Sequence, residues 1–442
     1  MEKAKKLSPS LILNILLFGF MGQVAWAVEN NFFNLFLFNE VGGTPEDISN
    51  MVMASSVVAV LTTLFMGSLS DKINKRKIFI CAGYIVWGFT VMAFALISPE
   101  NVAKIMGTTP AAAVSTTIIL VIVMDCIMTF MGSTSNDAAF NAWITDITSS
   151  SNRAKTESIL ALLPVIAMVG VTAAFGSLSG KFGYPACFIG LGAIVTICGI
   201  IGIFSIKESR TGVITTVNFT QALTYGFRPS VIKNNKSLYI SLVCMGIFAI
   251  ASQVFFPYLF IYVAHYIDMN TLKLTVPVIL LAVVVVVGAI AALVSIVLLS
   301  DKKGKAPFLF PSAAFFVIGL ILIYFADRNI IWFALAAIIA LVGYGLLMIM
   351  LNAAVRDFTP EDKAGQLQGI RMIFSVLLPM TIGPEIAVKV TDMYATAQYA
   401  NDYGEMVNIP APHIYLAAAA VGALIVIPLF FLSKEFKKQK AQ

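Results

Sequence analysis

Four acidic residues lie inside long apolar stretches of the chain: Glu29, Asp125, Asp137 and Glu385. A carboxylate inside hydrocarbon costs about 2.5–3.5 kcal/mol on insertion scales, so it persists where it has a partner or a function. Such groups can bind a proton or a cation and can accept hydrogen bonds from a polar solute. We interpret Glu385, close to an expected outer helix end, as structural and the other three as candidates for binding.

Asp125 is the most central of these acids. Together with Thr129, Gly132 and Asn136 it forms a stripe at helical spacing. A polar stripe of this kind must meet water or another polar helix. We interpret it as a site for a cation or proton and for substrate hydroxyls. The alternative is a polar contact that only holds helices together.

Glu29 follows Trp26 by three residues and has Asn30, Asn31 and Asn34 close by. An acid, several amides and an indole suit a sugar-like ligand, which offers a flat apolar face and many hydroxyls. We therefore take Trp26, Glu29, Asn30 and Asn34 as binding candidates. The alternative is that Glu29 lies near the outer mouth and is simply hydrated.

Asp137 lies about 120° around a helix from Asp125, so the two carboxylates are not expected to share one ion. Arg371 is its expected partner, in a pair that acts either as a gate or as a static brace. Tyr344 and Asn352, in a later apolar stretch, are further candidates for facing a binding cavity.

The composition indicates the elements that position these residues. The chain has 442 residues, of which 59% are hydrophobic and only 12% charged, whereas a soluble domain has about a quarter charged residues. A soluble enzyme is therefore excluded, and an all-α membrane protein is expected. Twelve apolar runs are long enough to cross a membrane: 11–38, 48–70, 78–98, 113–142, 159–179, 186–206, 238–262, 274–299, 306–326, 330–355, 365–388 and 414–432.

The distribution of basic residues sets the orientation. With the N-terminus inside, 24 of the 29 lysines and arginines fall in cytoplasmic segments, as the positive-inside rule requires. Both termini are then cytoplasmic, and the net charge of +6 reflects membrane anchoring rather than nucleic-acid binding. A signal peptide ending near Ala27 is the alternative for the first run. The lack of appended domains suits a bacterial inner (plasma) membrane.

Internal repeats indicate two related halves. Asn141–Thr148 recurs as Asn352–Thr359, with the Asn, Ala, Asp and Thr positions identical, and the loop around Asp71 recurs around Asp301. Two six-helix halves in the same orientation follow from this pattern. We place them at 1–206 and 237–442, joined by a cytoplasmic linker at 207–236.

The loop after the second run resembles the signature of the major facilitator superfamily, a glycine, a leucine, an aspartate and a basic cluster. The matching positions are Gly67, Leu69, Asp71, Lys72, Lys75, Arg76 and Lys77. Asn74 departs from it, because the family prefers glycine there. The resemblance covers the whole chain and implies the major facilitator fold. The acids in the first and fourth runs are in addition similar to those of glycoside–pentoside–hexuronide cation symporters and sucrose-type transporters.

The same resemblance implies a conformational latch. Asp71 and Arg76 in the first half, with Asp301 and Lys305 in the second, are the expected gating residues, and Arg371 joins them. Breaking such contacts accompanies the change between outward-facing and inward-facing states in the family. The alternative for the basic residues is anchoring alone, which does not account for the repeated aspartate.

The function expected from the sequence is secondary active transport of a small polar solute, a glycoside or oligosaccharide, by alternating access. The coupling ion is H⁺ or Na⁺, and no cofactor or structural metal is expected. An exporter or importer of amphiphiles, drugs or lipids is the alternative, and a non-transporting membrane sensor is another. An enzyme is not expected, because His265 and His413 lie in different outer loops without a reactive set around them. We expect a monomer in the bilayer.

Overall fold

The computed structural model describes residues 8–73, 75–148, 150–208, 220, 224–267, 306–360, 363–395 and 397–441. The chain folds into two compact units. The first is Met1–Ala222 with Asn401–Glu405, and the second is Leu223–Ala400 with Met406–Gln442. The boundary between them falls inside the expected linker 207–236.

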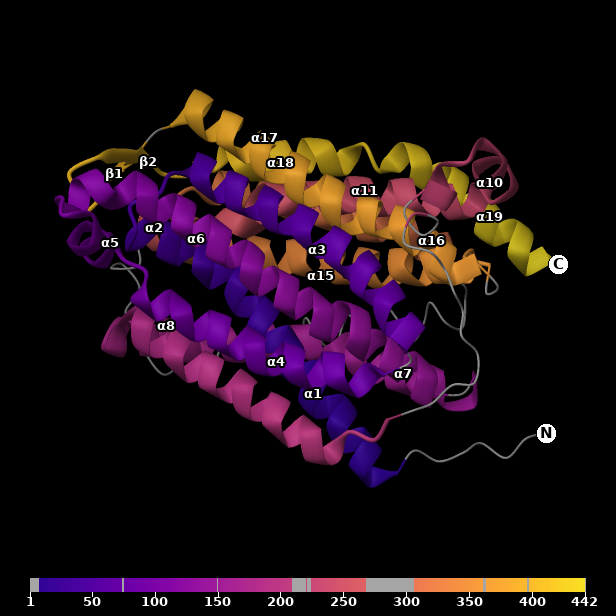
Figure 1. Ribbon diagram of the computed structural model, residues 1–442. Helices are drawn as coiled ribbons and strands as arrows, with labels where there is room; N and C mark the ends of the chain where they lie inside the picture. The colour runs from indigo at the N-terminus through magenta and orange to yellow at the C-terminus, as the bar shows by residue number, and fades with distance from the viewer. Residues whose placement is uncertain are drawn as a thin grey trace. The chain divides into compact units, whose positions relative to one another are not determined.

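All the regular elements in the described part of the first unit are helices (Figure 1). Its elements are α1 (Pro9–Ala27), η1 (Val28–Phe33), α2 (Asn34–Asn39), α3 (Pro45–Ile73), α4 (Arg76–Ala93), η2 (Phe94–Leu96), α5 (Pro99–Met106), α6 (Pro110–Gly132), η3 (Ser133–Phe140), α7 (Asn141–Ile147) and α8 (Ser150–Ser205).

The second unit is helical apart from one hairpin, in which β1 pairs antiparallel with β2. Its elements are η4 (Tyr225–Phe227), α10 (Pro229–Asn234), α11 (Lys236–Phe255), η5 (Phe256–Tyr258), α12 (Leu259–Ile261), η6 (Tyr262–Tyr266), α14 (Ala306–Ala326), α15 (Ile330–Asp357), α16 (Ala364–Met372), η9 (Ile373–Leu377), α17 (Leu378–Tyr394), β1 (Gln398–Ala400), β2 (Met406–Asn408), α18 (His413–Ala423) and α19 (Val426–Ala441).

The all-α membrane architecture expected from the sequence is confirmed. Among the described residues, nine helices are long and apolar enough to cross a membrane. The number rises to ten if the bent pair α18–α19 is counted as one span. The expected run 274–299 lies outside the described residues, and the expected run 159–179 falls within α8. A count of twelve fits the architecture but is not established by the described spans.

The long helix α8 contains the break expected between the fifth and sixth runs. Gly183 has φ 76° and ψ 166°, and two helices are joined across it. An L residue with a side chain rarely adopts a φ in this range, so glycine is required here. Pro185 follows two residues later and cannot donate a helical hydrogen bond. This pair divides α8 into two helices.

Small residues allow the helices of each unit to pack at close range. In the first unit α4 lies along α8 (Figure 1), and a Cβ at Gly88 would come within 2.4 Å of the Gly192 carbonyl oxygen. In the second, α14 packs on α15, and a Cβ at Gly343 would lie 2.1 Å from the Phe316 backbone nitrogen. Such small-residue contacts drive helix association in lipid, where apolar burial supplies no force.

Residues 401–405 pack with the first unit although they lie late in the chain. There the Tyr403 hydroxyl donates to the Glu40 carbonyl oxygen (3.0 Å) and to Glu100 Oε1 (3.1 Å). Burial raises the pKa of the Glu40 carboxyl, and the negative charges of Asp402 and Glu100 raise it further. Glu40 directly follows the first span, Pro9–Asn39, so its carboxyl lies outside that membrane-spanning segment.

We expect Gly343→Ala to destabilise the protein by about 1–3 kcal/mol, because the added methyl would meet backbone atoms that cannot move aside. Thermal unfolding of the purified protein in detergent measures this. Gly190→Ala is the matched control, since a Cβ at Gly190 meets nothing within 4 Å. Equal melting temperatures for Gly343→Ala and Gly190→Ala would contradict the close packing of α14 on α15.

Candidate functional site

Two residues from the predicted set meet directly in the first unit. Thr129 Oγ1, on α6, donates a hydrogen bond of 2.9 Å to Glu29 Oε1, on η1. Both side chains are buried, with 8% of Glu29 and 1% of Thr129 exposed. The acid of the first span and the polar stripe of the fourth therefore form one site.

Asp125 lies one helical turn before Thr129 on α6 and is only 2% exposed. Ser55, on α3, interacts with its carboxylate. The charges of Glu29 and Asp125 interact with each other, so the site brings like charges together in a buried place. Among the described residues, Glu29 Oε2 and Asp125 Oδ1 receive no hydrogen bond.

The first and fourth spans both change from α-helix to π-helix at their polar residues. The π-helical segment η1 contains Glu29, and η3 contains Asn136 and Asp137. Hydroxyl and amide side chains there bond back to the helix: Thr134 and Ser135, for example, donate to carbonyl oxygens four residues earlier. Such back-bonding competes with the regular ladder, and π-helical turns are frequent at functional sites.

Two tryptophans lie next to the carboxylates. The ring centroids of Trp26 and Trp87 are 5.2 Å apart at an interplanar angle of 51°. Gly132 makes room for both, since a Cβ there would come within 3.0 Å of each ring. Trp87 is fully buried, and its Nε1 is a donor without an acceptor among the described residues. Trp26 also interacts with Asp137.

Three asparagines near Glu29 in the first span direct their amide nitrogens to their own helix. Asn30 donates to the Trp26 carbonyl oxygen (2.8 Å) and Asn34 to that of Asn30 (2.8 Å). Asn31 donates in the same way to the Ala27 carbonyl oxygen, at 2.9 Å. One of the two N–H donors of each amide is therefore engaged locally, which reduces what these side chains can donate to a ligand.

Asn136 takes part in a contact between helices. Its amide donates to the Tyr84 hydroxyl (2.8 Å), which in turn donates to the Phe18 carbonyl oxygen (2.6 Å). Gly22 allows α1 to approach this amide, because a Cβ there would lie 2.1 Å from Asn136 Nδ2. The geometry corresponds to the helix-holding alternative for this end of the stripe.

Among the other predicted residues, Asp137 also acts on Glu29 through its charge. Asp137 accepts a hydrogen bond of 3.0 Å from Ser133 Oγ. Its pairing with Arg371 stays a prediction, because Arg371 is in α16 of the other unit.

In the second unit, Tyr344 packs against Phe256 at 5.3 Å between centroids, and Asn352 donates to the Met348 carbonyl oxygen. Their role in binding stays a prediction. Glu385 is half exposed and pairs with Lys389 at 3.3 Å, in line with its structural interpretation.

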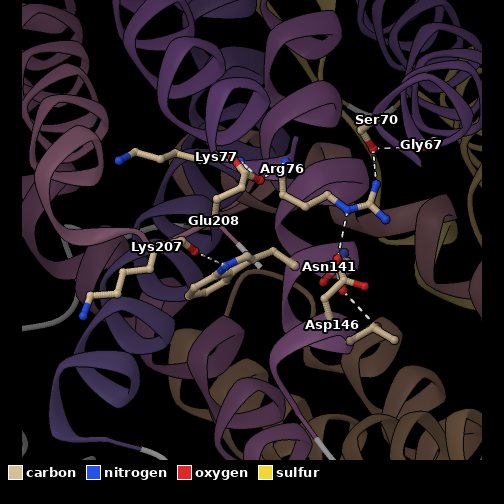
Figure 2. A network of polar contacts seen from close by, with 10 residues as sticks. Gly67, Ser70, Arg76, Lys77, Asn141, Asp146, Lys207 and Glu208 are labelled. Carbon is tan, nitrogen blue, oxygen red and sulfur yellow. Dashed lines mark hydrogen bonds and ion pairs between the residues drawn. The ribbon is translucent and has the colours of Figure 1, made fainter. Parts of the chain in front are cut away.

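Arg76 is the centre of a polar network at the start of α4 (Figure 2). Its Nε lies 3.1 Å from Asp146 Oδ2, and its Nη1 donates to Ser70 Oγ at 2.6 Å. Glu208 Oε1 accepts from the backbone nitrogens of Arg76 (2.6 Å) and Lys77 (3.3 Å). Glu208 thereby caps the first turn of α4, where the free N–H groups favour an anion.

Of the four residues expected to form the conformational latch, the structure describes the side chain of Arg76. Arg76 is 7% exposed and joins the end of α3, α7 and the residues after α8. The side chain of Asp71 and the positions Asp301 and Lys305 lie outside the described residues, so their gating role stays a prediction.

Several residues of these networks were not singled out from the sequence as site residues. Asp146 was visible only as part of the repeat, and Glu208 only as a charge at the start of the linker. Tyr84 and Trp87 carry a signal that sequence reading passed over, a hydroxyl and an indole N–H in the middle of an apolar run. A buried donor of this kind needs an acceptor.

We expect Arg76→Gln to lower the free energy of unfolding by about 3–5 kcal/mol, the typical effect of breaking a buried ion pair by removing one of its charges. The side chains of this pair are only 9% and 13% exposed. Lys389→Gln is the control, because its pair with Glu385 is exposed at 72% and 52% and should contribute less than about 1 kcal/mol. Denaturant titration in micelles measures both, and equal losses would argue against a structural role of the Arg76 network.

Comparison with known proteins supports one superfamily. The family model "Major Facilitator Superfamily" matches residues 15–384. A search of curated proteins found no match.

Solved transporters share the fold. The nucleoside transporter NupG is 14% identical with a TM-score of 0.65, covering 95% of this chain and 98% of NupG. A bacterial homolog of the human lysosomal transporter Spinster, in an inward-facing and unoccupied conformation, is 12% identical with a TM-score of 0.67, covering 98% and 99%. The peptide transporter POT in complex with sulfate is 12% identical with a TM-score of 0.65, covering 95% and 93%.

Helical spans, a mixed carboxylate and indole site and a family match over most of the chain lead to one conclusion: this chain belongs to the major facilitator superfamily of membrane transporters.

Proposed function

We propose that the chain is a secondary active transporter that moves a small polar solute, a glycoside or oligosaccharide, together with H⁺ or Na⁺. The observation that carries the proposal is the buried pair of Glu29 and Asp125, which lacks a described basic partner and leaves an oxygen of each carboxylate unbonded. We take the protein as a monomer in a bacterial inner membrane, with both termini cytoplasmic.

The coupling argument rests on charge. Two interacting carboxylates in a buried site are costly while both are ionised. A proton on one of them, or a sodium ion bound by their oxygens with the Thr129 hydroxyl, removes that cost. Such a cation is held at a site whose exposure alternates between the two membrane faces, and its gradient then drives the cycle.

The solute argument rests on the neighbouring indoles. Trp26 offers an aromatic face next to the acids, and Trp87 Nε1 is a buried donor without a described acceptor. A sugar ring provides an apolar face for the first and a hydroxyl oxygen for the second. The carboxylate oxygens left over can accept hydrogen bonds from other hydroxyls.

One observation favours an amphiphile as a second candidate solute. The amide nitrogens of Asn30, Asn31 and Asn34 are engaged by their own helix. Fewer donors are then available to a ligand rich in hydroxyls than the residue types alone would indicate. A substrate panel has to contain amphiphiles as well as glycosides.

The coupling residues are tested by uptake of radiolabelled glycosides into proteoliposomes, with a Na⁺ gradient and a pH gradient imposed separately. We expect one gradient to drive accumulation in the wild type. Asp125→Asn and Glu29→Gln should lose accumulation but still move solute down its own concentration gradient. The reason is that the amide side chains carry no negative charge for the coupling cation to neutralise.

Glu385→Gln is the control for this test, because it removes an acid that is exposed and paired with Lys389. It should accumulate solute like the wild type. Undiminished accumulation by Asp125→Asn and by Glu29→Gln would remove both residues from the coupling mechanism. Movement of amphiphiles but not of glycosides would replace the proposed solute.

Trp26 is tested through the apparent affinity for the transported solute. We expect Trp26→Ala to raise KM by about two- to tenfold, the effect of losing one aromatic contact, and Trp26→Phe to restore most of the affinity. Trp332→Ala is the control, because Trp332 is 64% exposed on α15. An unchanged KM in Trp26→Ala would show that this ring does not contact the solute.

A further inference from the structure

A polar cavity of about 360 Å³ lies in the second unit, whereas the carboxylate site belongs to the first. It is formed by η4, the short helix α10 and the residue that precedes α16. The residues that line it are Tyr225, Arg228, Ser230, Val231, Asn234, Asn235 and Lys363. Because α10 is part of the expected cytoplasmic stretch 207–236, this cavity is expected at the inner membrane surface.

Packing holds the walls of this cavity in place. The Tyr239 hydroxyl, on α11, donates to the Gly226 carbonyl oxygen. Gly226 lies so close to Ile370 of α16 that a Cβ there would come within 2.6 Å of the Ile370 Cβ. Val231 and Ile370 belong to one buried apolar cluster. The cavity is thus built on a packed floor rather than on a loose loop.

Two cations, Arg228 and Lys363, line this cavity. None of the ion pairs in the described part of the chain includes either of them. The Arg228 guanidinium lies 5.4 Å from the centroid of the Tyr225 ring, a cation–π contact that restrains its position. Side chains of Ser230, Asn234 and Asn235 add neutral hydrogen-bonding groups. This combination is typical of phosphate recognition.

The surroundings of the cavity indicate where the phosphate comes from. Phe227 and Ile232 flank it with 52% and 40% of their surfaces exposed. Lys233 and Lys236, both exposed, lie on the same short stretch. Exposed apolar side chains among basic residues are the pattern of a segment that lies in a membrane interface with anionic lipids.

We propose that this cavity binds the phosphate headgroup of an anionic phospholipid of the inner leaflet. Arg228 and Lys363 neutralise the phosphate, the polar side chains of α10 contact the headgroup, and Phe227 and Ile232 enter the acyl boundary. The bound lipid holds the start of α11 and the start of α16 at the membrane surface. This assignment is independent of the transported solute.

The test measures lipid binding to the purified full-length protein by native mass spectrometry. Dimyristoyl phosphatidylglycerol is titrated against phosphatidylcholine with the same chains. We expect the wild type to prefer phosphatidylglycerol by about tenfold, and Arg228→Gln/Lys363→Gln to lose that preference, as removal of charge-assisted hydrogen bonds requires. Melting temperatures without added lipid verify that the variants are folded.

Lys233→Gln/Lys236→Gln is the matched control, because it removes the same charge from the same surface without touching the cavity. It should keep the preference for phosphatidylglycerol. An equal loss in both double variants, or no headgroup preference in the wild type, would overturn the cavity as a lipid site. Glycerol 3-phosphate and inorganic phosphate form the second arm, and binding of either as tight as that of the lipid would overturn the lipid as its source.

Discussion

The hydrocarbon interior of a membrane offers no water to a polar group, and this constraint governs the whole molecule. Backbone groups are satisfied within helices, which is why strands are confined to one short hairpin among the described residues. Helices approach through glycines such as Gly88 and Gly343, because apolar burial gives no driving force between them in lipid. Every buried polar side chain must then find a partner inside the protein or bind one from outside.

The first unit meets this requirement in two different ways. Around Arg76 the requirement is met by the protein itself: Asp146 pairs with the guanidinium, and Glu208 caps the helix that carries it. Around Glu29 and Asp125, only part of the requirement is met, because one oxygen of each carboxylate has no described donor. A satisfied network holds helices together, whereas an unsatisfied one changes its energy when a cation or solute arrives.

Much of the architecture could be predicted from the sequence. The apolar runs place most helices within a few residues, and the acids inside them locate the candidate site, because buried charge is rare enough to be informative. The contact between Glu29 and Thr129 joins residues one hundred positions apart, which no local pattern specifies. The role of Glu208 was equally hidden, since a charge in a linker is ordinary until the fold brings it to a helix start.

The π-helical turns could not be predicted from the apolar periodicity of the sequence. They also make that periodicity unreliable for assigning residues to one face of a helix. A helix advances about 100° per residue, and a π-helical turn contains one residue more than an α-helical turn. Residues that follow η1 or η3 therefore point in a different direction, relative to the residues that precede it, from the one a regular helical wheel predicts.

A wheel drawn through the whole first or fourth span assigns the outer and the inner part of the same helix to inconsistent faces. Alignments of this chain with relatives that lack these turns need a one-residue gap inside a membrane span. Without that gap, Asn34 and Asn141 would be matched to residues that point elsewhere.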